Sequence, residues 1–231
     1  TGSSMIDNWG TLTITSGTYT GGLNVVKSEE GSTLVINGGT FTCDYGKKWS
    51  YTAVILVYGD TTINGGTFIQ KTTNTSSYAK VVMTGKVDGY EAITKITGGS
   101  FTNEKLSGIF YGHGKATSDN FEVSGGTFNK YVSDSYFKTG YVCVKNENGT
   151  YGVAEGKIVA EVDYTGYTSF EAAIAAANAL TRSGTIYLRE NLTVDYPIVI
   201  ENAKNKAITL NLQGHTLTST YAMSSSGAYA L

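Results

Sequence analysis

The chain has 231 residues, including 29 glycines, 17 tyrosines and a single proline, and its formal net charge is −2. Charged residues make up only 16% of it, and the lysines are scattered, which excludes both a basic stripe for nucleic acid and a polybasic membrane patch. No apolar run approaches the roughly 20 residues that span a bilayer. Abundant glycine, threonine and aromatic residues favour many short strands joined by tight turns.

A six-residue motif recurs five times in the first part of the chain. It consists of an aliphatic residue, a polar residue, two glycines or a near equivalent, threonine or serine, and an aromatic residue. The copies span residues 14–19, 36–41, 63–68, 96–101 and 123–128, at intervals of 22, 27, 33 and 27 residues. A fixed motif at variable intervals is typical of a solenoid whose coils share one corner and differ in loop length. A propeller, the main structural alternative, normally needs repeats of about 40 residues or more.

Side-chain alternation in a strand predicts where the motif residues point. Ile36 and Phe41 can enter the core while Thr40 and Thr42 face outward, and the glycine pair between them permits a sharp corner. Coils stacked about 4.8 Å apart would then place like residues above one another. We therefore predict an all-β, right-handed parallel β-helix with two internal ladders. The aromatic ladder comprises Tyr19, Phe41, Phe68, Phe101 and Phe128, and the aliphatic ladder comprises Ile14, Ile36, Ile63, Ile96 and Val123.

A β-hairpin is predicted over residues 141–153, where two alternating runs flank Asn148-Gly149. It would close the end of the solenoid, because an exposed strand edge invites aggregation. Residues 155–168 are expected to form a linker. The spacing of Thr168 and Glu171 predicts a capping box for a short helix that covers the start of a β-helix core. The helix runs from Phe170 to Leu180, and its apolar face comprises Phe170, Ala173, Ile174, Ala177 and Leu180.

Beyond the helix, short apolar runs predict strands at residues 185–188, 192–194, 198–200 and 208–212, the third directly after Pro197. The segment Leu212–Leu217 matches the repeated motif, with leucine in place of the aromatic residue and His215 at the second glycine, as an outward turn residue. If residue 231 were followed by residue 1, the interval from Leu212 to Ile14 would be 33 residues, a value already present between two copies.

We therefore expect residues 1–155 to contain coils and their closing hairpin, and residues 156–231 to supply the capping helix and the first coils of the same kind of unit. Two arrangements satisfy this order. The chain is either one period of a tandem array, whose open ends meet neighbouring repeat units of the same protein, or a permuted single domain, in which residues 184–231 stack ahead of residue 1.

Together these segments resemble the repeat regions of large surface proteins of Gram-positive, often gut-dwelling bacteria. The resemblance is carried by the Ile-x-Gly-Gly-Thr-Phe coils, the hairpin around Asn148-Gly149, the segment 167–174 and the segment 210–217, and it covers nearly the whole chain. Those regions have the pectin-lyase-like β-helix fold and are described as adhesins. The resemblance implies a secreted or cell-surface location; it says little about function, because this fold carries lyases, hydrolases and binding proteins alike.

Residues for catalysis are sparse. A polysaccharide lyase needs a basic residue and acidic calcium ligands, and a glycoside hydrolase needs clustered carboxylates. The chain has two arginines, Arg182 and Arg189, in positions typical of solvated side chains, and neither an Asp-Asp pair nor a calcium loop. Cys43 and Cys143 lie outside any metal-binding spacing, and we expect two unpaired thiols. We predict no catalytic residue, no metal and no cofactor, with a lyase or hydrolase as the alternative.

A ligand-binding surface is predicted in the longest aromatic-rich loop, because aromatic planes beside cationic and hydroxyl groups suit sugar rings. The candidate residues are Tyr45, Lys47, Lys48, Trp49 and Tyr51, joined by Tyr111 and His113. Other inter-coil tyrosines that could extend this surface are Tyr78, Tyr90, Tyr131 and Tyr136. The plainer interpretation is that these rings only pack loops onto the solenoid.

The sequence thus favours a non-catalytic extracellular adhesion or stalk module, with a glycan or a host surface glycoprotein as partner. A third hypothesis, ice binding, rests on outward threonines at residues 18, 20, 40, 42 and 102, a column interrupted by Ile69 and Asn129. Threonine also has a high strand propensity, which explains the same column without a ligand.

Overall fold

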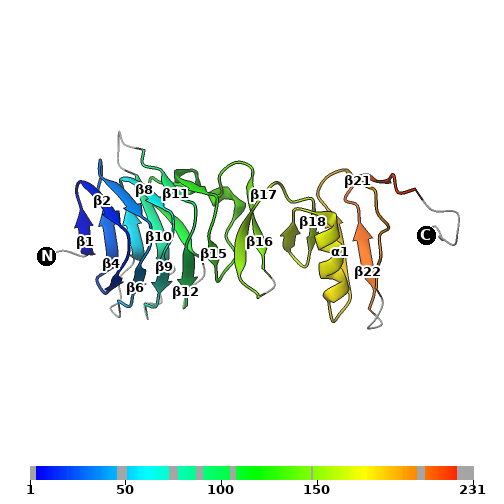
Figure 1. The fold of residues 1–231 in the computed structure, drawn as a ribbon, viewed down its shortest axis with the longest axis horizontal. Coiled ribbons are helices and arrows are strands. Elements are labelled where there is room, and N and C mark those ends of the chain that lie inside the picture. Colours follow the sequence, from blue (N-terminus) through cyan, green and yellow to red (C-terminus); the bar gives the residue numbers. More distant parts are fainter. Residues whose placement is uncertain are drawn as a thin grey trace. The chain divides into compact units, whose positions relative to one another are not determined.

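The computed structural model describes residues 4–45, 51–72, 78–86, 91–104, 108–146, 148–201 and 206–222. The chain is mainly β-structure, as predicted, and the described residues contain one α-helix. It divides into two compact units, Thr1–Glu155 and Gly156–Leu231, which are described separately (Figure 1).

Three parallel sheets build the unit Thr1–Glu155, each made of every third strand of the chain. The first sheet contains β1 (Ser4–Asn8), β4 (Asn24–Ser28), β7 (Thr52–Val57), β10 (Ala79–Lys86) and β13 (Phe110–Gly114). The second contains β2 (Thr11–Ile14), β5 (Thr33–Ile36), β8 (Asp60–Ile63), β11 (Thr94–Ile96) and β14 (Phe121–Val123). The third contains β3 (Thr18–Thr20), β6 (Thr40–Cys43), β9 (Thr67–Gln70), β12 (Ser100–Asn103) and β15 (Thr127–Phe128). The chain therefore visits the three sheets in turn, and we call three consecutive strands, one from each sheet, a coil.

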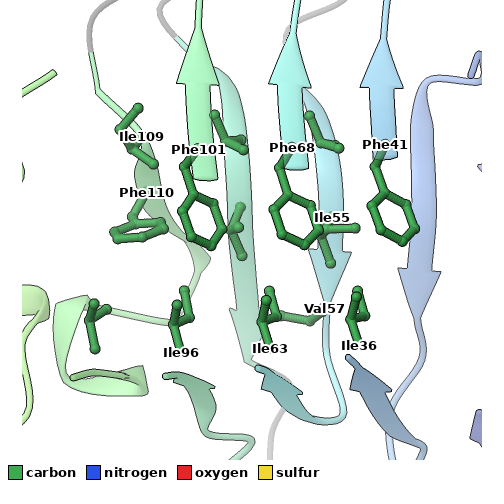
Figure 2. Packing of buried hydrophobic residues seen from close by; sticks show 14 of the residues in the cluster. Ile36, Phe41, Ile55, Val57, Ile63, Phe68, Ile96, Phe101, Ile109 and Phe110 are labelled. Atoms are coloured by element: carbon green, nitrogen blue, oxygen red, sulfur yellow. The ribbon is translucent and has the colours of Figure 1, made fainter. Parts of the chain in front are cut away.

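The register keeps equivalent motif residues side by side in successive coils. Ile36 pairs with Ile14 on one side and Ile63 on the other, and Phe41 pairs likewise with Tyr19 and Phe68. Figure 2 shows Phe41, Phe68 and Phe101 in one row, with Ile36, Ile63 and Ile96 in a second row. Both predicted ladders are thus confirmed in the described residues.

The aromatic ladder is stacked face to face at nearly the spacing of the strands. Ring centroids of Phe41 and Phe68 are 5.0 Å apart with an interplanar angle of 7°, and those of Phe68 and Phe101 are 4.9 Å apart at 10°. Parallel strands lie about 4.8 Å apart, so each ring contacts the next without a change of rotamer. Tyr19, the first ring, is only partly buried, and its hydroxyl donates to the carbonyl of Ser16 at 2.8 Å.

The two glycines of the corner serve different physical needs. The second one has a positive φ, for example 109° at Gly39 and 113° at Gly66, which a residue with a Cβ atom adopts only with strain. The first one lies against the preceding coil: a Cβ atom on Gly65 would be 2.8 Å from the carbonyl oxygen of Asn37. The first glycine therefore allows close stacking, and the second allows the change of direction.

The hairpin predicted at residues 141–153 is confirmed. It consists of β16 (Tyr141–Lys145) and β17 (Tyr151–Glu155), which pair antiparallel around Gly149, a residue with φ 82°. β17 also pairs antiparallel with β15, so it occupies the edge of the third sheet that the coils leave open. Two short 3₁₀ helices, η1 (Ser118–Asn120) and η2 (Asp134–Tyr136), lie in the segments around β14 and β15.

In the unit Gly156–Leu231, the helix α1 (Phe170–Ala179) packs against a small sheet. This sheet has the order β19 (Thr165–Tyr167), β18 (Ala160–Val162), β20 (Gly184–Leu188), β22 (Ile208–Asn211). The buried residues Phe170, Ala173, Ile174 and Ala177 confirm the predicted apolar face. The predicted capping box is wrong by one residue: Ser169 is the N-cap, and its Oγ accepts from the backbone N–H of Ala172 at 3.2 Å.

Two further expectations for this unit are wrong. Part of the expected linker 155–168 forms the hairpin β18–β19, whose turn residues Asp163 and Tyr164 both have positive φ. Residues 198–200 form no strand: the Asn178 side chain accepts from the N–H of Glu201 and donates to the carbonyl of Val199, so backbone groups there bond to the helix. The strands β21 (Leu192–Val194) and β23 (Leu217–Ser219) pair in parallel, as do β20 and β22.

The turn between β22 and β23 differs from the glycine corners of the other unit. Gln213 and Gly214 both have positive φ, 53° and 83°, and the N–H of His215 donates to the carbonyl of Leu212 at 2.8 Å. The predicted motif match at residues 212–217 therefore holds for side-chain spacing but not for backbone conformation.

Cys43 and Cys143 are unpaired, as predicted, and the structure shows that both are buried. Burial raises the pKa of the Cys43 thiol above its ordinary value and raises the pKa of Cys143 to about 11. Both thiols therefore stay protonated at neutral pH and fill apolar space.

Lys206, two residues before β22, connects that part of the chain to the end of the helix α1. Its side chain is buried, and its ammonium group donates to the carbonyls of Ala177 and Leu180, each at 3.0 Å, and to that of Asn178. These are carbonyl groups that the last turn of a helix leaves without a partner in the helix. A cation here also interacts favourably with the helix dipole.

We expect Phe68→Ala to lower the free energy of unfolding by about 3–5 kcal/mol, because it removes a fully buried ring between two others and leaves a cavity. Chemical denaturation followed by circular dichroism measures the change. Lys95→Ala, an exposed position on β11, is the control and should have little effect. Equal losses for the two variants would contradict the assignment of the stability to the ladder.

We expect Lys206→Met to destabilise the unit Gly156–Leu231 by about 1–3 kcal/mol, because the helix carbonyls lose their donor while the apolar volume is kept. Amide hydrogen exchange at the end of α1 should accelerate. Lys157→Met, at an exposed lysine that pairs with Glu190, is the matched control. Unchanged exchange in the Lys206 variant would show that the ammonium does not hold the helix end.

Candidate functional site

The outward side chains of the first sheet form a row across neighbouring strands. The register pairs Lys27 with Leu56, Leu56 with Met83, and Met83 with Tyr111. These residues alternate with core residues such as Val26, so they lie on the opposite face of the sheet. The row runs from a cationic residue, through two apolar residues, to a tyrosine.

Aromatic side chains gather over this row. The Tyr51 ring lies 4.7 Å from the Tyr78 ring and 4.7 Å from the His113 ring, and the Tyr78 ring lies 5.3 Å from that of Tyr111. Tyr51 and Tyr78 each precede a strand of the first sheet directly, whereas Tyr111 and His113 belong to β13. Met83 is 1% exposed, so this outward side chain is covered.

A glycine makes room for a further tyrosine in the same place. A Cβ atom on Gly85 would lie 2.0 Å from Cε1 of Tyr58, so the Tyr58 ring rests where a side chain of β10 would otherwise project. Gly85 pairs with His113 across the strands, and the Tyr58 hydroxyl is 3.1 Å from Nδ1 of His113. Lys27 lies 5.6 Å from the centroid of the Tyr58 ring and pairs with Glu29. We call Tyr51, Tyr58, Tyr78, Tyr111 and His113 the tyrosine cluster.

The tyrosine cluster borders a cavity of about 250 Å³. Its lining combines apolar side chains with polar ones: Leu23, Asn24, Lys27, Tyr51, Leu56, Tyr58, Met83 and His113. Tyr51 and Tyr78 keep 40% and 37% of their surface exposed, so both side chains are partly accessible to solvent. The lining therefore combines apolar side chains and aromatic rings with hydroxyl, imidazole and ammonium groups.

Burial sets the protonation states of the cluster. It raises the pKa of Tyr58 above its ordinary value, although the Lys27 charge acts in the opposite direction, and it raises the pKa of Tyr111. It lowers the pKa of His113 below the ordinary histidine value of 6.5. At neutral pH the Tyr58 and Tyr111 phenols are therefore protonated and the His113 imidazole is neutral. When the Tyr58 hydroxyl donates to Nδ1 of His113, Nε2 carries the imidazole proton and can donate to a ligand.

The structure brings together three of the residues predicted from sequence: Tyr51, Tyr111 and His113. Tyr45 instead packs against the core of its unit, and its carbonyl accepts a hydrogen bond from the Thr72 hydroxyl. Lys47, Lys48 and Trp49 lie outside the described residues.

The additional tyrosines considered from sequence divide in the same way. Tyr78 belongs to the tyrosine cluster, whereas Tyr136 packs on Phe110 and Phe121, and the Tyr131 ring contacts that of Tyr151. For Tyr136 the packing interpretation is the better one, whereas Tyr131 is 54% exposed and lies outside the tyrosine cluster. Tyr90 lies outside the described residues.

Sequence reasoning missed Tyr58, Gly85, Leu56 and Met83. The signal that could have found them is the alternation of the first-sheet strands, which places every second residue of β7 and β10 on the outer face. A glycine at an outward position of a strand, here Gly85, marks a close approach by another group.

A second hollow lies in the unit Gly156–Leu231, with a volume of about 590 Å³. It brings both arginines of the chain together with two acids. Arg182 pairs with Asp163 at 2.7 Å, and Arg189 pairs with Glu161. Both arginine side chains are solvent-exposed, as predicted, and the hairpin β18–β19 also places an acid beside each of them.

Comparison with protein-family models, with curated proteins and with solved structures gave no match. The resemblance to pectin-lyase-like surface proteins therefore stays a prediction. Among the described residues, no helix has the length and hydropathy that crossing a membrane requires. Nor do the described ranges contain three His, Cys, Asp or Glu residues close enough together to hold a metal ion.

We expect the His113 ring to titrate below pH 6.5, because the folded state resists charging a covered imidazole. The unfolded chain then takes up this proton at higher pH than the folded protein. The stability that neutral His113 contributes is therefore full above pH 6.5 and is lost as the pH falls from 6.5 through the folded pKa.

An NMR titration of the His113 ring signals measures this pKa. Tyr51→Ala uncovers the ring and should move the midpoint upward, towards 6.5, whereas Tyr58→Phe leaves the cover in place and should change it less. A midpoint at or above 6.5 in the unsubstituted chain would contradict the burial of this imidazole.

Proposed function

We propose that the chain is a non-catalytic adhesion or stalk module of an extracellular bacterial surface protein, and that it binds carbohydrate at the tyrosine cluster. The observation that carries the proposal is the contact of Tyr51, Tyr78 and His113 beside a cavity of about 250 Å³. A sugar ring has apolar faces edged by hydroxyl groups. Exposed aromatic planes contact such faces, and neighbouring phenol, imidazole and ammonium groups bond to the edges.

The size and chemistry of the cavity favour one sugar unit, with its neighbours outside. The volume is below the range typical of pockets for drug-sized ligands. Leu56 and Met83 provide an apolar floor, and Lys27 together with Nε2 of His113 provides donors. Because the Lys27 charge is balanced by Glu29, the site favours a neutral sugar over an anionic one.

The scaffold that we infer for this site is a right-handed parallel β-helix. Three parallel sheets visited in turn, continuous inward ladders and a closing hairpin all support it. Such a solenoid is long and rigid, which suits a stalk that holds a binding face away from a cell surface.

A polysaccharide lyase or hydrolase is the second candidate, favoured by the hollow in which Arg182 and Arg189 meet Asp163 and Glu161. Each of these carboxylates is held by an arginine, so an acidic substrate would have to displace an ion pair before binding. Ice binding is supported less: Ile69 stands in register with Thr42 and Thr102, and it interrupts the outward row.

A glycan array with the purified chain tests the main proposal. The glycans that respond should bind Tyr51→Ala and Tyr78→Ala about tenfold more weakly or worse, because each change removes an exposed ring face. Trp9→Ala, at an aromatic residue 73% exposed and outside the tyrosine cluster, should bind normally. Trp49→Ala tests the loop predicted from sequence in the same experiment.

Three outcomes would count against the proposal. No response on the array, or full binding by both tyrosine variants, would exclude the tyrosine cluster as a sugar site. Shortened or unsaturated products recovered after incubation, lost in Arg189→Ala, would instead favour the enzyme.

A further inference from the structure

Each unit has an edge strand with apolar side chains that are less buried than their register partners on the next strand. In the unit Gly156–Leu231, Ile186 is 1% exposed, but Leu210, its register partner on β22, is 40% exposed. Leu212, which directly follows β22, is 37% exposed. Among the described strands of its sheet, β22 lies at the edge, so its outer backbone groups have no ladder partner.

The first coil of the unit Thr1–Glu155 also has apolar side chains that are not fully buried. Leu12 and Tyr19 are only partly buried, whereas their register partners Leu34 and Phe41 are fully buried. β2 and β3 are edges of their sheets in the described part of the chain. Among the described residues, each unit therefore has an incompletely buried apolar column at a strand edge with no partner strand.

The two open ends have the same side-chain spacing. Leu210, Leu212 and Leu217 follow one another at intervals of two and five residues, and Leu12, Ile14 and Tyr19 follow at the same intervals. Parallel pairing of β22 with β2, and of β23 with β3, would place these residues opposite one another. It would continue the register that already joins β20 to β22 and β21 to β23.

The corner geometry fits this pairing as well. Ser16 stands where the later coils have their first glycine. In those coils a Cβ atom at this position would meet a carbonyl oxygen of the preceding coil. A coil stacked against Ser16 must therefore have the corresponding carbonyl directed elsewhere. In the glycine corners only the second glycine has a positive φ, whereas both Gln213 and Gly214 do, so the peptide groups of the β22–β23 turn take other directions.

We propose that the chain associates head to tail with a second copy of itself, the edge β22–β23 of one copy adding to the edge β2–β3 of the next. The interface is heterologous, so each copy keeps one free edge of either kind and association continues beyond a dimer. It uses the strand register alone and does not depend on the proposed sugar site.

Sedimentation velocity of the full chain tests this proposal. The concentration should run from about 10 µM to about 1 mM, because an interface made of strands of three or four residues is small and is expected to be weak. The unsubstituted chain should form species larger than a monomer as the concentration rises. Leu210→Lys and Leu12→Lys should each weaken this association about tenfold or more, because each puts a charge into the apolar column. Thr209→Lys and Thr13→Lys, on the same strands but at exposed positions beside these leucines, are the matched controls and should associate normally.

Mixing the two blocked variants gives the decisive measurement. Leu210→Lys retains a free β2–β3 edge and Leu12→Lys retains a free β22–β23 edge, so an equimolar mixture should form a 1:1 dimer and stop there. Circular dichroism of each variant confirms that it is folded. A chain that stays monomeric at every concentration, as it would if the two edges met within one molecule, overturns the proposal. So does association that the two leucine variants leave intact.

Discussion

The structure of the unit Thr1–Glu155 depends on the contact between successive backbones at the glycine corner. A Cβ atom on Gly65 would meet the carbonyl of Asn37, and one on Gly98 would come within 2.5 Å of the carbonyl of Asn64. With glycine there, coils approach to the strand spacing, and Phe41, Phe68 and Phe101 stack ring on ring. No coil buries its apolar face alone, so stability is shared between neighbours.

The strand register that aligns the core residues also aligns the outward side chains of the first sheet. Strands held in line by inward residues such as Ile55 and Val82 must present Leu56 and Met83 side by side on the other face. Gly85 then leaves a gap in which the Tyr58 ring can lie, and this ring reaches His113 across β10. The candidate site is thus a consequence of strand alignment, with loop residues Tyr51 and Tyr78 added over it.

Features encoded in one local pattern could be predicted from the sequence, and features that depend on a partner far along the chain could not. The five motif copies predicted both ladders, and Asn148-Gly149 predicted the hairpin. Choosing Thr168 over Ser169 as the helix cap failed because both are good caps and only the backbone conformation separates them. The apolar run 198–200 suggested a strand, but its backbone bonds to Asn178 in the helix.

For the candidate site, the residue types suggested which side chains could bind a sugar, but the sequence did not show which of them lie close together in space. Tyr51, Tyr111 and His113 were predicted because aromatic and imidazole side chains suit a sugar ring. Tyr45 has the same chemistry as Tyr51, but it packs on the core. Tyr58 and Met83 were missed because their role depends on which strands are neighbours.

The variable spacing of the motif separates what must stay constant in this protein from what is free to change. Intervals from 22 to 33 residues connect corners of the same geometry, so extra residues accumulate between strands without disturbing the stacked rings. Tyr51 and Tyr78 lie within two such intervals, each directly before a strand of the first sheet. Lengthening a surface loop costs little entropy once its ends are held. Substitutions and insertions in these connections can therefore change the outer surface while the folded frame stays the same.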